Sequence, residues 1–253
     1  MSKGETTMSA PVMLVAGGSR GIGAAIAKMA SERGYDVAIN YVNNREAAEA
    51  VAAHVRAQGQ QAALIQGDMA QEADIKRMFA ECEAAFGRLD TLVYNAGGGG
   101  GKLSSLADAA TSTLRRAIDL NLLGAHFAAS EAIRRMSTRR GGNGGNILFT
   151  SSRSSEYGNP GLGVWYAAVK NGINVLTTAL SKEVAEDGIR VNAISPGPIH
   201  TDANDPAAHP ERLAWIPMKR YGQPSEVAEA ALFLTSPAAS FITGVILNVS
   251  GGR

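Results

Sequence analysis

The sequence contains a single cysteine, Cys82, among 253 residues. One cysteine excludes an internal disulfide and any cysteine-rich zinc or iron–sulfur site, and this favours a reducing compartment. The sequence also lacks an excess of charge of either sign, because 24 Lys and Arg residues face 23 Asp and Glu residues, for a net charge of +1. Nucleic-acid-binding and membrane-surface proteins are typically more basic, so neither kind of partner is expected.

Long apolar runs and targeting signals are missing as well. No run approaches the roughly 18–20 apolar residues of a membrane span; the best candidates are short pieces such as residues 230–234. Residues 1–10 are polar and lack the apolar region of a secretory signal, so we expect a flexible tail. The sequence therefore predicts a cytoplasmic location with no membrane association.

Metal ligands do not cluster in the sequence. The histidines form no i,i+3 or i,i+4 pair and have no carboxylate triad nearby, so no metal site is expected; they are His54, His126, His200 and His209. Four arginines within residues 134–140 form a basic cluster at the end of a predicted helix. Cations there complement the helix dipole, which explains the cluster without nucleic acid.

Short apolar runs alternate with longer segments of helical period along the chain, as in βαβ units. The expected strands, rich in Val, Ile, Leu and Ala, span residues 12–16, 36–41, 61–66, 91–95, 146–151, 190–194 and 245–249. The expected helices span residues 21–33, 44–57, 71–86, 111–136, 164–186 and 225–235. The pattern predicts one α/β Rossmann-type domain over residues 11–253, a doubly wound, seven-stranded parallel sheet with helices on both faces.

Two segments interrupt this alternation. Residues 97–101 are five consecutive glycines after a predicted strand, and we expect mobile backbone that cannot pack. Residues 198–221 hold four of the nine prolines and are too long for an ordinary βα connection. We expect them to form a substrate lid, with residues 202–216 mobile until cofactor binds. A fixed surface helix packed on the core is the alternative.

A glycine-rich turn joins the first predicted strand to the first helix, and its candidate cofactor contacts are Gly17, Ser19, Arg20, Gly21, Ile22 and Gly23. Gly17 lets the chain leave the strand sharply, Gly21 lets the backbone approach a phosphate, and Gly23 lets the helix pack closely. The helix N-terminus adds free N–H groups and partial positive charge, so we expect the turn to bind a pyrophosphate. The spacing differs from G-x-G-x-x-G, and a tight turn without ligand is the alternative.

The end of the second predicted strand bears on the choice of cofactor. An acid there would bind the ribose 2′-hydroxyl of NAD, but residues 40–45 contain no carboxylate. A 2′-phosphate is expected to bind Arg20, Tyr41, Asn43 and Asn44, together with the start of the next helix. NADP(H) is therefore favoured over NAD(H), with a merely solvated Arg20 as the alternative.

Tyr166 and Lys170 are four residues apart on a predicted helix and so share one face. A phenol, with a reference pKa of about 10, exchanges protons poorly near pH 7, and a nearby ammonium group is a plausible means of lowering that pKa. The pair alone is a weak signal. Upstream, the strand over residues 146–151 runs into Ser151 and Ser152, whose hydroxyls stand at its carboxyl end and are suited to hold a carbonyl oxygen.

At this point residues 12–252 resemble the short-chain dehydrogenase/reductase family, including its NADP-preferring carbonyl reductases and 3-oxoacyl reductases. The matching segments are residues 17–23, 67–69, 95–97, 119–121, 192–201, 243–244 and 251–252, together with Ser152, Tyr166 and Lys170. The resemblance implies a catalytic serine, tyrosine and lysine at these three positions, and a catalytic Asn121 that bends its helix around a proton-relay water. It also implies a homotetramer, or a dimer.

The resemblance further implies which residues surround the cofactor. From the adenine to the nicotinamide they are Asp68, Met69, Asn95, Ala96, Gly97, Tyr166, Lys170, Pro196, Gly197, Ile199 and Thr201. Lys170 would hold the nicotinamide ribose hydroxyls, and Ile199 and Thr201 would seat the carboxamide.

The chain departs from the family pattern at Ala16, Tyr94 and Ser250, where threonine, asparagine and aspartate are usual. We expect these changes to affect supporting hydrogen bonds and not the chemistry. The spacing from Ser152 to Tyr166 is one residue longer than is common, which leaves Ser151 and Ser152 as alternatives for the substrate-facing serine. Strand alternation favours Ser152.

Two functions are compatible with these features. The leading hypothesis is an NADP-dependent oxidoreductase that interconverts a small carbonyl compound and a secondary alcohol. The alternative is a redox-sensing regulator that binds the cofactor on the same fold without catalysis. Such a regulator needs no acid–base group, so the Ser152, Tyr166 and Lys170 set favours the enzyme.

Overall fold

The apolar runs of the sequence become the strands of one sheet, whose inner strands are almost entirely buried and whose two edge strands are partly buried. The computed structural model describes residues 10–202 and 204–253, so residues 1–9 of the predicted tail lie outside the described residues. The strands in the described residues are β1 (Val12–Ala16), β2 (Asp36–Tyr41), β3 (Ala62–Gln66), β4 (Thr91–Tyr94), β5 (Gly145–Thr150), β6 (Ile189–Pro196) and β7 (Ile246–Val249). All neighbours pair in parallel, in the order β3-β2-β1-β4-β5-β6-β7. The predicted fold class is confirmed.

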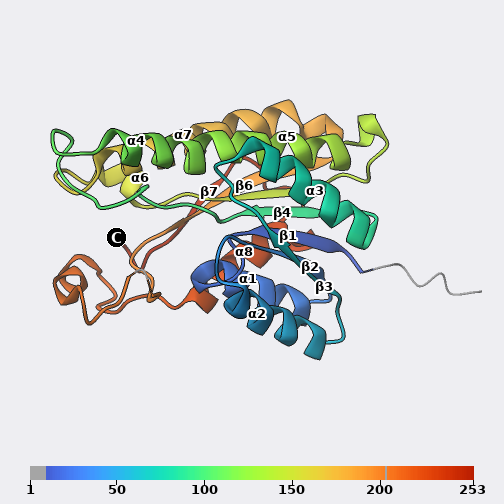
Figure 1. The fold of residues 1–253 in the computed structure, drawn as a ribbon, viewed down its shortest axis with the longest axis horizontal. Coiled ribbons are helices and arrows are strands. Elements are labelled where there is room, and N and C mark those ends of the chain that lie inside the picture. The colour runs from blue at the N-terminus through green and yellow to red at the C-terminus, as the bar shows by residue number, and fades with distance from the viewer. Residues whose placement is uncertain (1–9, 203) are drawn as a thin grey trace, which may run out of the picture.

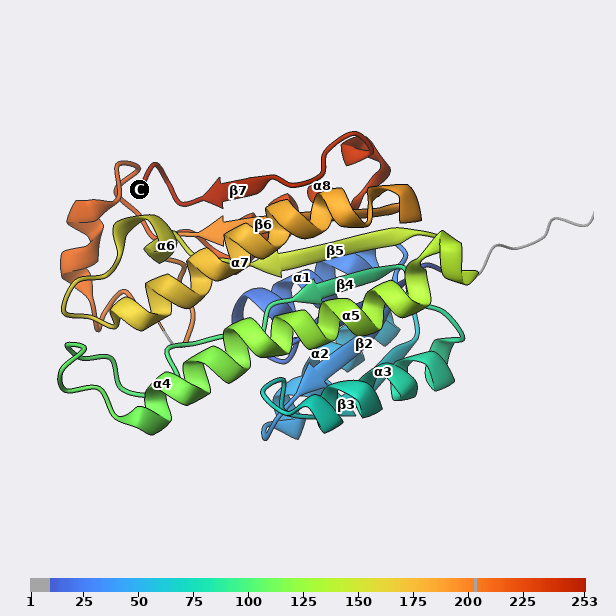
Figure 2. The same cartoon turned by 90° about the horizontal axis from the view of Figure 1, so that it is seen from above.

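Helices cover both faces of the sheet (Figures 1 and 2). They are α1 (Gly21–Glu32), α2 (Arg45–Ala57), α3 (Glu72–Phe86), α4 (Thr111–Ile118), α5 (Gly124–Met136), α6 (Ser154–Tyr157), α7 (Val164–Glu183) and α8 (Pro224–Thr235). On one face α1, α2 and α8 bury side chains such as Ile26 and Val227. On the other, α3, α5 and α7 bury side chains such as Phe79 and Ile173. The two cores make the sheet the middle of three layers.

The helix predicted over residues 111–136 is formed, and it changes its winding around Asn121, the residue that the resemblance implied would bend it. Asp119–Leu123 forms a π-helical turn between α4 and α5. The hydroxyl of Tyr94, at the end of β4, donates a hydrogen bond to the carbonyl of Leu120 at 2.5 Å. The wider turn places Asn121 in the interior, where it is fully buried. A tertiary contact fixes this turn, so the helical period of the sequence does not reveal it.

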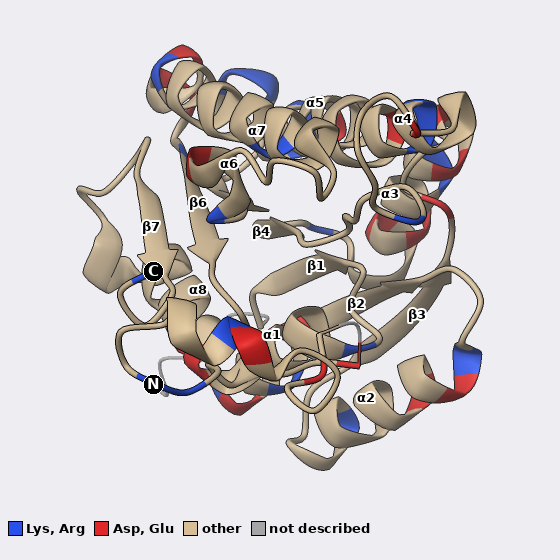
Figure 3. Cartoon of the chain, turned by 90° about the vertical axis from the view of Figure 1, so that its left-hand side faces the viewer, with Lys and Arg blue, Asp and Glu red and all other residues tan. Residues whose placement is uncertain are grey.

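The strand order changes direction at β1, which has β2 on one side and β4 on the other. In doubly wound sheets, ligands bind outside the carboxyl ends of the strands at such a switch point. Figure 3 looks onto this end of the molecule. The segments that follow β1, β4, β5 and β6 begin at this edge, so the glycine turn, the glycine run, Ser152 and the predicted lid lie around one crevice.

Basic and acidic residues are interspersed along the helices of both outer layers (Figure 3). In residues 10–202 and 204–253, no helix is long and apolar enough to span a membrane. Within the same residues, no three His, Cys, Asp or Glu side chains are placed to hold a metal ion.

Candidate active site

The glycine turn after β1 has the backbone geometry of a phosphate cradle. Gly17 and Gly21 have φ angles of +71° and +53°, a region that L side chains rarely adopt. A Cβ on Gly23 would lie 2.1 Å from the carbonyl oxygen of Gly17, so only glycine fits there. No side chain caps α1, so its first N–H groups remain available to an anion. These features fit the pyrophosphate of a dinucleotide cofactor.

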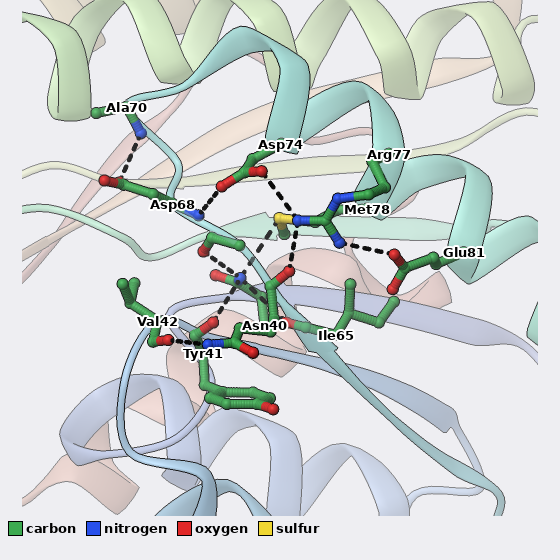
Figure 4. A network of polar contacts seen from close by, with 12 residues as sticks. Asn40, Tyr41, Val42, Ile65, Asp68, Ala70, Asp74, Arg77, Met78 and Glu81 are labelled. Atoms are coloured by element: carbon green, nitrogen blue, oxygen red, sulfur yellow. Dashed lines mark hydrogen bonds and ion pairs between the residues drawn. The ribbon is translucent and has the colours of Figure 1, made fainter.

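Asn40, which the sequence reading did not single out, holds this turn in place; Figure 4 shows its contacts on the other side, toward Ile65 and Met78. Its side-chain oxygen accepts a hydrogen bond from the Gly17 N–H at 2.9 Å, and its amide donates to the carbonyl of Gly67 at 2.9 Å. From the other side, Asn95 donates to the carbonyl of Gly17 at 3.2 Å. The cradle is thus tied to β2, β3 and β4. The sequence signal that could have identified Asn40 is a polar residue near the end of an otherwise apolar strand.

The side chains expected around a 2′-phosphate lie in different environments at the end of β2. Tyr41 is buried in the core, with its hydroxyl accepting a hydrogen bond from Arg45 at 3.2 Å. Asn44 caps α2 by accepting from the Ala47 N–H. Arg20 is exposed beside the glycine turn. Arg45 is an additional cation here that the sequence reading did not assign to the site.

A cavity of about 390 Å³ lies at the carboxyl ends of β2 and β3, lined by Val42, Asn43, Gln66, Gly67, Asp68, Asp74 and Arg77. Asp68 is held there by a bidentate ion pair with Arg116, at 2.7 and 2.9 Å. Burial raises the pKa of Asp68, but the hydrogen bonds and charge of Arg116 outweigh it and the net pKa is lowered. Met69 is buried beside it. Asn40 connects Gly67, which lines the cavity, to Gly17 of the glycine turn, and the cavity fits the adenosine end of a dinucleotide.

Ser152, Tyr166 and Lys170 come together from β5 and α7. The Ser152 side chain lies close enough to the Tyr166 phenol to offset part of the rise of its pKa on burial. Lys170 Nζ lies 5.8 Å from the centre of the Tyr166 ring and donates to the carbonyl of Thr150 at 2.7 Å. Tyr166 is half-buried, and Lys170 is 3% exposed. The packing of β5 against α7 brings Ser152 to Tyr166. The helical spacing of four residues brings Lys170 to Tyr166.

The structure places Ser152, and not Ser151, beside the tyrosine. Ser151 is buried and turned toward α7, where its hydroxyl donates to Asn174 Oδ1 at 2.6 Å. The hydroxyl of Ser152 accepts from the Ser154 N–H at 3.1 Å as α6 begins. The short helix α6, absent from the sequence-based expectation, accommodates the longer spacing between Ser152 and Tyr166.

Asn121 and Lys170 converge on the glycine run after β4. The Asn121 amide donates to the carbonyl of Gly98 at 2.8 Å, and its oxygen accepts from the Gly98 N–H at 3.2 Å. A Cβ on Gly97 would lie 2.8 Å from both Asn121 Oδ1 and Lys170 Nζ. Trp165 donates to the carbonyl of Gly99 at 2.9 Å. The expectation that this run cannot pack is therefore wrong, because the absence of side chains lets its backbone lie directly against α4 and α7.

Burial dominates the electrostatics of the tyrosine and lysine. It lowers the pKa of Lys170 from 10.5 to about 8. Burial also raises the pKa of Tyr166, and the nearby Ser152 side chain only partly opposes this rise. The sequence reading expected a lowered tyrosine pKa, but the described residues hold the phenol in its protonated form at neutral pH. A protonated phenol suits Tyr166 to donate a proton.

The segment after β6 reaches back to the glycine turn. A Cβ on Gly21 would lie 3.2 Å from Thr201 Cγ2, so the two loops are in contact. Ile199 is buried at 4% exposure, and the Gly197 N–H donates to the carbonyl of Val249 at 3.0 Å. Pro196 is the last residue of β6. The residues expected near a nicotinamide thus lie between the glycine turn, which Thr201 contacts, and the segment after β5, where the Arg153 N–H donates to the carbonyl of Pro196 at 3.0 Å.

The lid segment, residues 198–221, continues from there; Ala203 lies outside the described residues. It contains a 3₁₀ helix, Pro210–Trp215, and only part of its apolar surface is packed. Ile216 is 1% exposed, whereas Trp215 is 44% and Met218 61% exposed. A cavity of about 550 Å³ between the segment and the start of α8 is lined by His200, Pro206, Leu213, Lys219, Arg220, Tyr221, Gln223 and Glu226.

Comparisons with known proteins agree with this geometry. A family model described as Enoyl-(Acyl carrier protein) reductase matches residues 16–253. The chain is 39% identical to the uncharacterized oxidoreductase YgfF of Escherichia coli, over 96% of this chain and 99% of that protein. It is 38% identical to the 3-oxoacyl-[acyl-carrier-protein] reductase FabG of Staphylococcus aureus, over 94% and 96%. A short-chain dehydrogenase of Burkholderia cenocepacia in complex with NADP has a TM-score of 0.90 at 33% identity, over 96% and 97%.

The Rossmann-type sheet and its glycine turn define an oxidoreductase that depends on a nicotinamide cofactor. The relatives cover nearly the whole chain and share more than a third of its residues. The chain belongs to the short-chain dehydrogenase/reductase family.

Proposed function

We propose that this protein is an NADP(H)-preferring reductase that interconverts a carbonyl compound and a secondary alcohol, with Tyr166 as the acid and base. The observation that carries the proposal is the convergence of three side chains: Lys170 Nζ lies 5.8 Å from the centre of the Tyr166 ring, and Ser152 lies close enough to the phenol to offset part of the rise of its pKa on burial. These groups stand beside the segments that fit the cofactor, so a substrate there reaches a proton donor and an oxygen-binding hydroxyl together.

The cofactor, when bound, supplies or accepts the hydride at the carbonyl carbon. The Ser152 hydroxyl and the Tyr166 phenol hold the carbonyl oxygen, and Tyr166 gives its proton to that oxygen as negative charge develops. With a pKa of about 8, Lys170 is mostly protonated at pH 7, so its charge stabilises the phenolate that remains. Asn121 orders the glycine run beside Lys170 through its two hydrogen bonds with Gly98.

Oxidation of NADPH over a panel of uncharged and charged ketones tests this function. The panel includes a 3-oxoacyl ester, because the S. aureus relative is a 3-oxoacyl-[acyl-carrier-protein] reductase. Substrate-dependent oxidation with formation of the alcohol is the expected result. Tight NADPH binding without turnover on any ketone would favour the redox-sensing regulator instead.

The preference for NADPH is proposed on the cations near the end of β2. Arg20 is exposed beside the glycine turn, and Arg45 contacts the Tyr41 hydroxyl. The Tyr41 ring itself is buried, so the two guanidinium groups are the better placed donors for a 2′-phosphate.

Removing both cations tests this preference. The variant with Arg20→Ala and Arg45→Ala is expected to bind NADPH roughly 10- to 100-fold more weakly, because charge-assisted hydrogen bonds to the phosphate are lost. NADH affinity should change less than about threefold, and calorimetric titration with both cofactors measures the two effects. Equal losses for NADH and NADPH, or tighter NADH binding by the unaltered protein, would contradict the proposal.

A homotetramer is proposed from two separate apolar surfaces. Ile118, Leu123 and Val175 are exposed on α4, the π turn and α7, with Val175 64% exposed. Phe233 and Phe241 are exposed on α8 and before β7, and the Phe241 side chain is fully exposed. Two self-complementary surfaces generate a closed tetramer, whereas one generates a dimer.

Light scattering at micromolar concentration is expected to give four times the chain mass of 26.3 kDa. Val175→Glu places a charge in the helical surface and should reduce the mass to that of a dimer. A mass near 26 kDa for the unaltered protein would refute the assembly.

The lid function of residues 198–221 is proposed from their position. Thr201 contacts the glycine turn at one end, and Ile216 is anchored in the core at the other. Amide hydrogen exchange across residues 202–216 should slow in saturating NADPH, because a bound cofactor adds contacts at Thr201. Unchanged exchange would indicate a permanently fixed segment.

A further inference from the structure

Four side chains near the entrance of the site form a continuous series of contacts. Arg253 Cζ lies 4.4 Å from the ring centre of Trp215 in the lid segment and 5.3 Å from that of Tyr157 in α6. Arg153, which follows Ser152 directly, lies 5.0 Å from the Tyr157 ring centre and donates to the Tyr157 hydroxyl at 2.7 Å. Figures 1 and 2 show the end of the chain between α6 and the lid segment. Arg253 therefore bridges two walls of the crevice.

The backbone around Arg253 is fixed by its neighbours. Arg153 Nε donates to the carbonyl oxygen of Arg253 at 2.6 Å, and Ser250 donates to the same oxygen at 2.7 Å. The carbonyl of Gly251 accepts from the Met218 N–H at 3.1 Å. Together with the two aromatic rings, these contacts hold the guanidinium group of Arg253 in one place, so its N–H groups are preorganised.

The guanidinium group of Arg253 forms no ion pair with an Asp or Glu side chain among the described residues. Arg153 pairs with Glu156, and Arg212 lies 4.0 Å from Glu211, but the side chain of Arg253 donates no hydrogen bond to a described residue. Burial lowers the pKa of Arg253, and the charges of Arg212 and Arg153 lower it further. A guanidinium group in this environment has a strong preference for a bound anion.

We propose that Arg253 recognises an anionic group, a carboxylate or a phosphate, on the carbonyl substrate. The inference rests on the proposed function and adds the substrate class to it. The aromatic rings of Trp215 and Tyr157 engage the faces of the guanidinium group, and its edge forms a bidentate pair with the anion. The Arg153 side chain, which is 12% exposed, supports the arrangement by holding Tyr157 and the Arg253 backbone.

Matched pairs of charged and uncharged substrates test the proposal. The first arm compares oxo acids, with the carbonyl at carbons 2 to 5, with their ethyl esters; the second compares dihydroxyacetone phosphate with dihydroxyacetone. The unaltered protein should have the higher kcat/KM for the anionic member of at least one pair. The arm in which the preference occurs distinguishes a carboxylate from a phosphate.

Arg253→Met removes the charge and keeps an apolar side chain of similar length. It is expected to lower kcat/KM for the anionic substrate roughly 10- to 100-fold, mainly through KM, and to change the uncharged partner less than about threefold. Arg140→Met, at an exposed arginine beyond the other end of the sheet, is the control for net charge and should change neither value.

The remaining outcomes overturn the inference in distinguishable ways. Equal losses for both members of a pair would mean that Arg253 only fastens the lid segment. Reduction of uncharged ketones without preference for any anion would overturn the anion site and leave the proposed function intact. No reduction of any carbonyl compound would overturn both.

Discussion

Tyr166→Phe is expected to lower kcat for ketone reduction by about three to four orders of magnitude, because the variant has no proton to give to the carbonyl oxygen. The ring and its packing are retained, so the affinity for NADPH should change less than about threefold. Stopped-flow or steady-state NADPH oxidation measures the first effect, and calorimetric titration measures the second.

Tyr35→Phe is a matched control for this substitution. Tyr35 is also a partly buried tyrosine whose pKa burial raises, but it lies directly before the start of β2, at the opposite end of the sheet. The control should retain full turnover. Activity of Tyr166→Phe within tenfold of the unaltered protein would remove Tyr166 from the mechanism.

Lys170→Met is expected to lower kcat by about two orders of magnitude or more and, at the same time, to stabilise the fold at pH 7. The activity falls because the phenolate of Tyr166 loses the neighbouring positive charge. The fold gains stability because the buried ammonium group is costly: its pKa is about 8, against 10.5 for an ordinary lysine. That difference corresponds to about 3 kcal/mol of destabilisation below pH 8, which the lost hydrogen bond to the Thr150 carbonyl reduces to a net gain of roughly 1–2 kcal/mol.

The free energy of unfolding should depend on pH in a direction that tests the explanation for Lys170→Met. Between pH 8 and 10.5 the unfolded chain still holds the Lys170 proton while the folded chain has released it, so the unaltered protein gains stability with rising pH. The stability advantage of Lys170→Met should therefore shrink from pH 7 to pH 10 in urea unfolding. A constant difference across that range would show that burial of the charge is not the cause.

Local patterns in the sequence predict the strands and several residues of the candidate site. The near-continuous apolar runs marked every strand within about two residues, since strands inside the sheet hold few polar residues, Asn40 being one of them. The glycine turn was identified from its position between a strand and a helix. Tyr166 and Lys170 were paired because a helical spacing of four is a local geometric relation.

Contacts between segments far apart in the sequence could not be predicted from local patterns. Asn40 carries no motif, and its importance depends on Gly17 and Gly67 lying on either side of β2. The π turn at Asn121 depends on a hydroxyl from Tyr94, more than twenty residues earlier. The glycine run was expected to be loose because its composition says nothing of the helices that pack on it.

The sequence by itself predicts the order of strands and helices and the position of the glycine turn, because each follows from periodicity or spacing within a short segment. Spacing also places Tyr166 and Lys170 on one helix face, but their role as the acid–base pair is implied by the family resemblance and stays a prediction. Only the tertiary structure decided that Ser152 and not Ser151 contacts Tyr166, and that Asn121 and Lys170 meet at Gly97. It also decided that burial raises the pKa of Tyr166 and that Arg253 lies between Tyr157 and Trp215. These features depend on the distances between residues far apart in the chain and on the burial of their side chains. Both are set only when the chain folds.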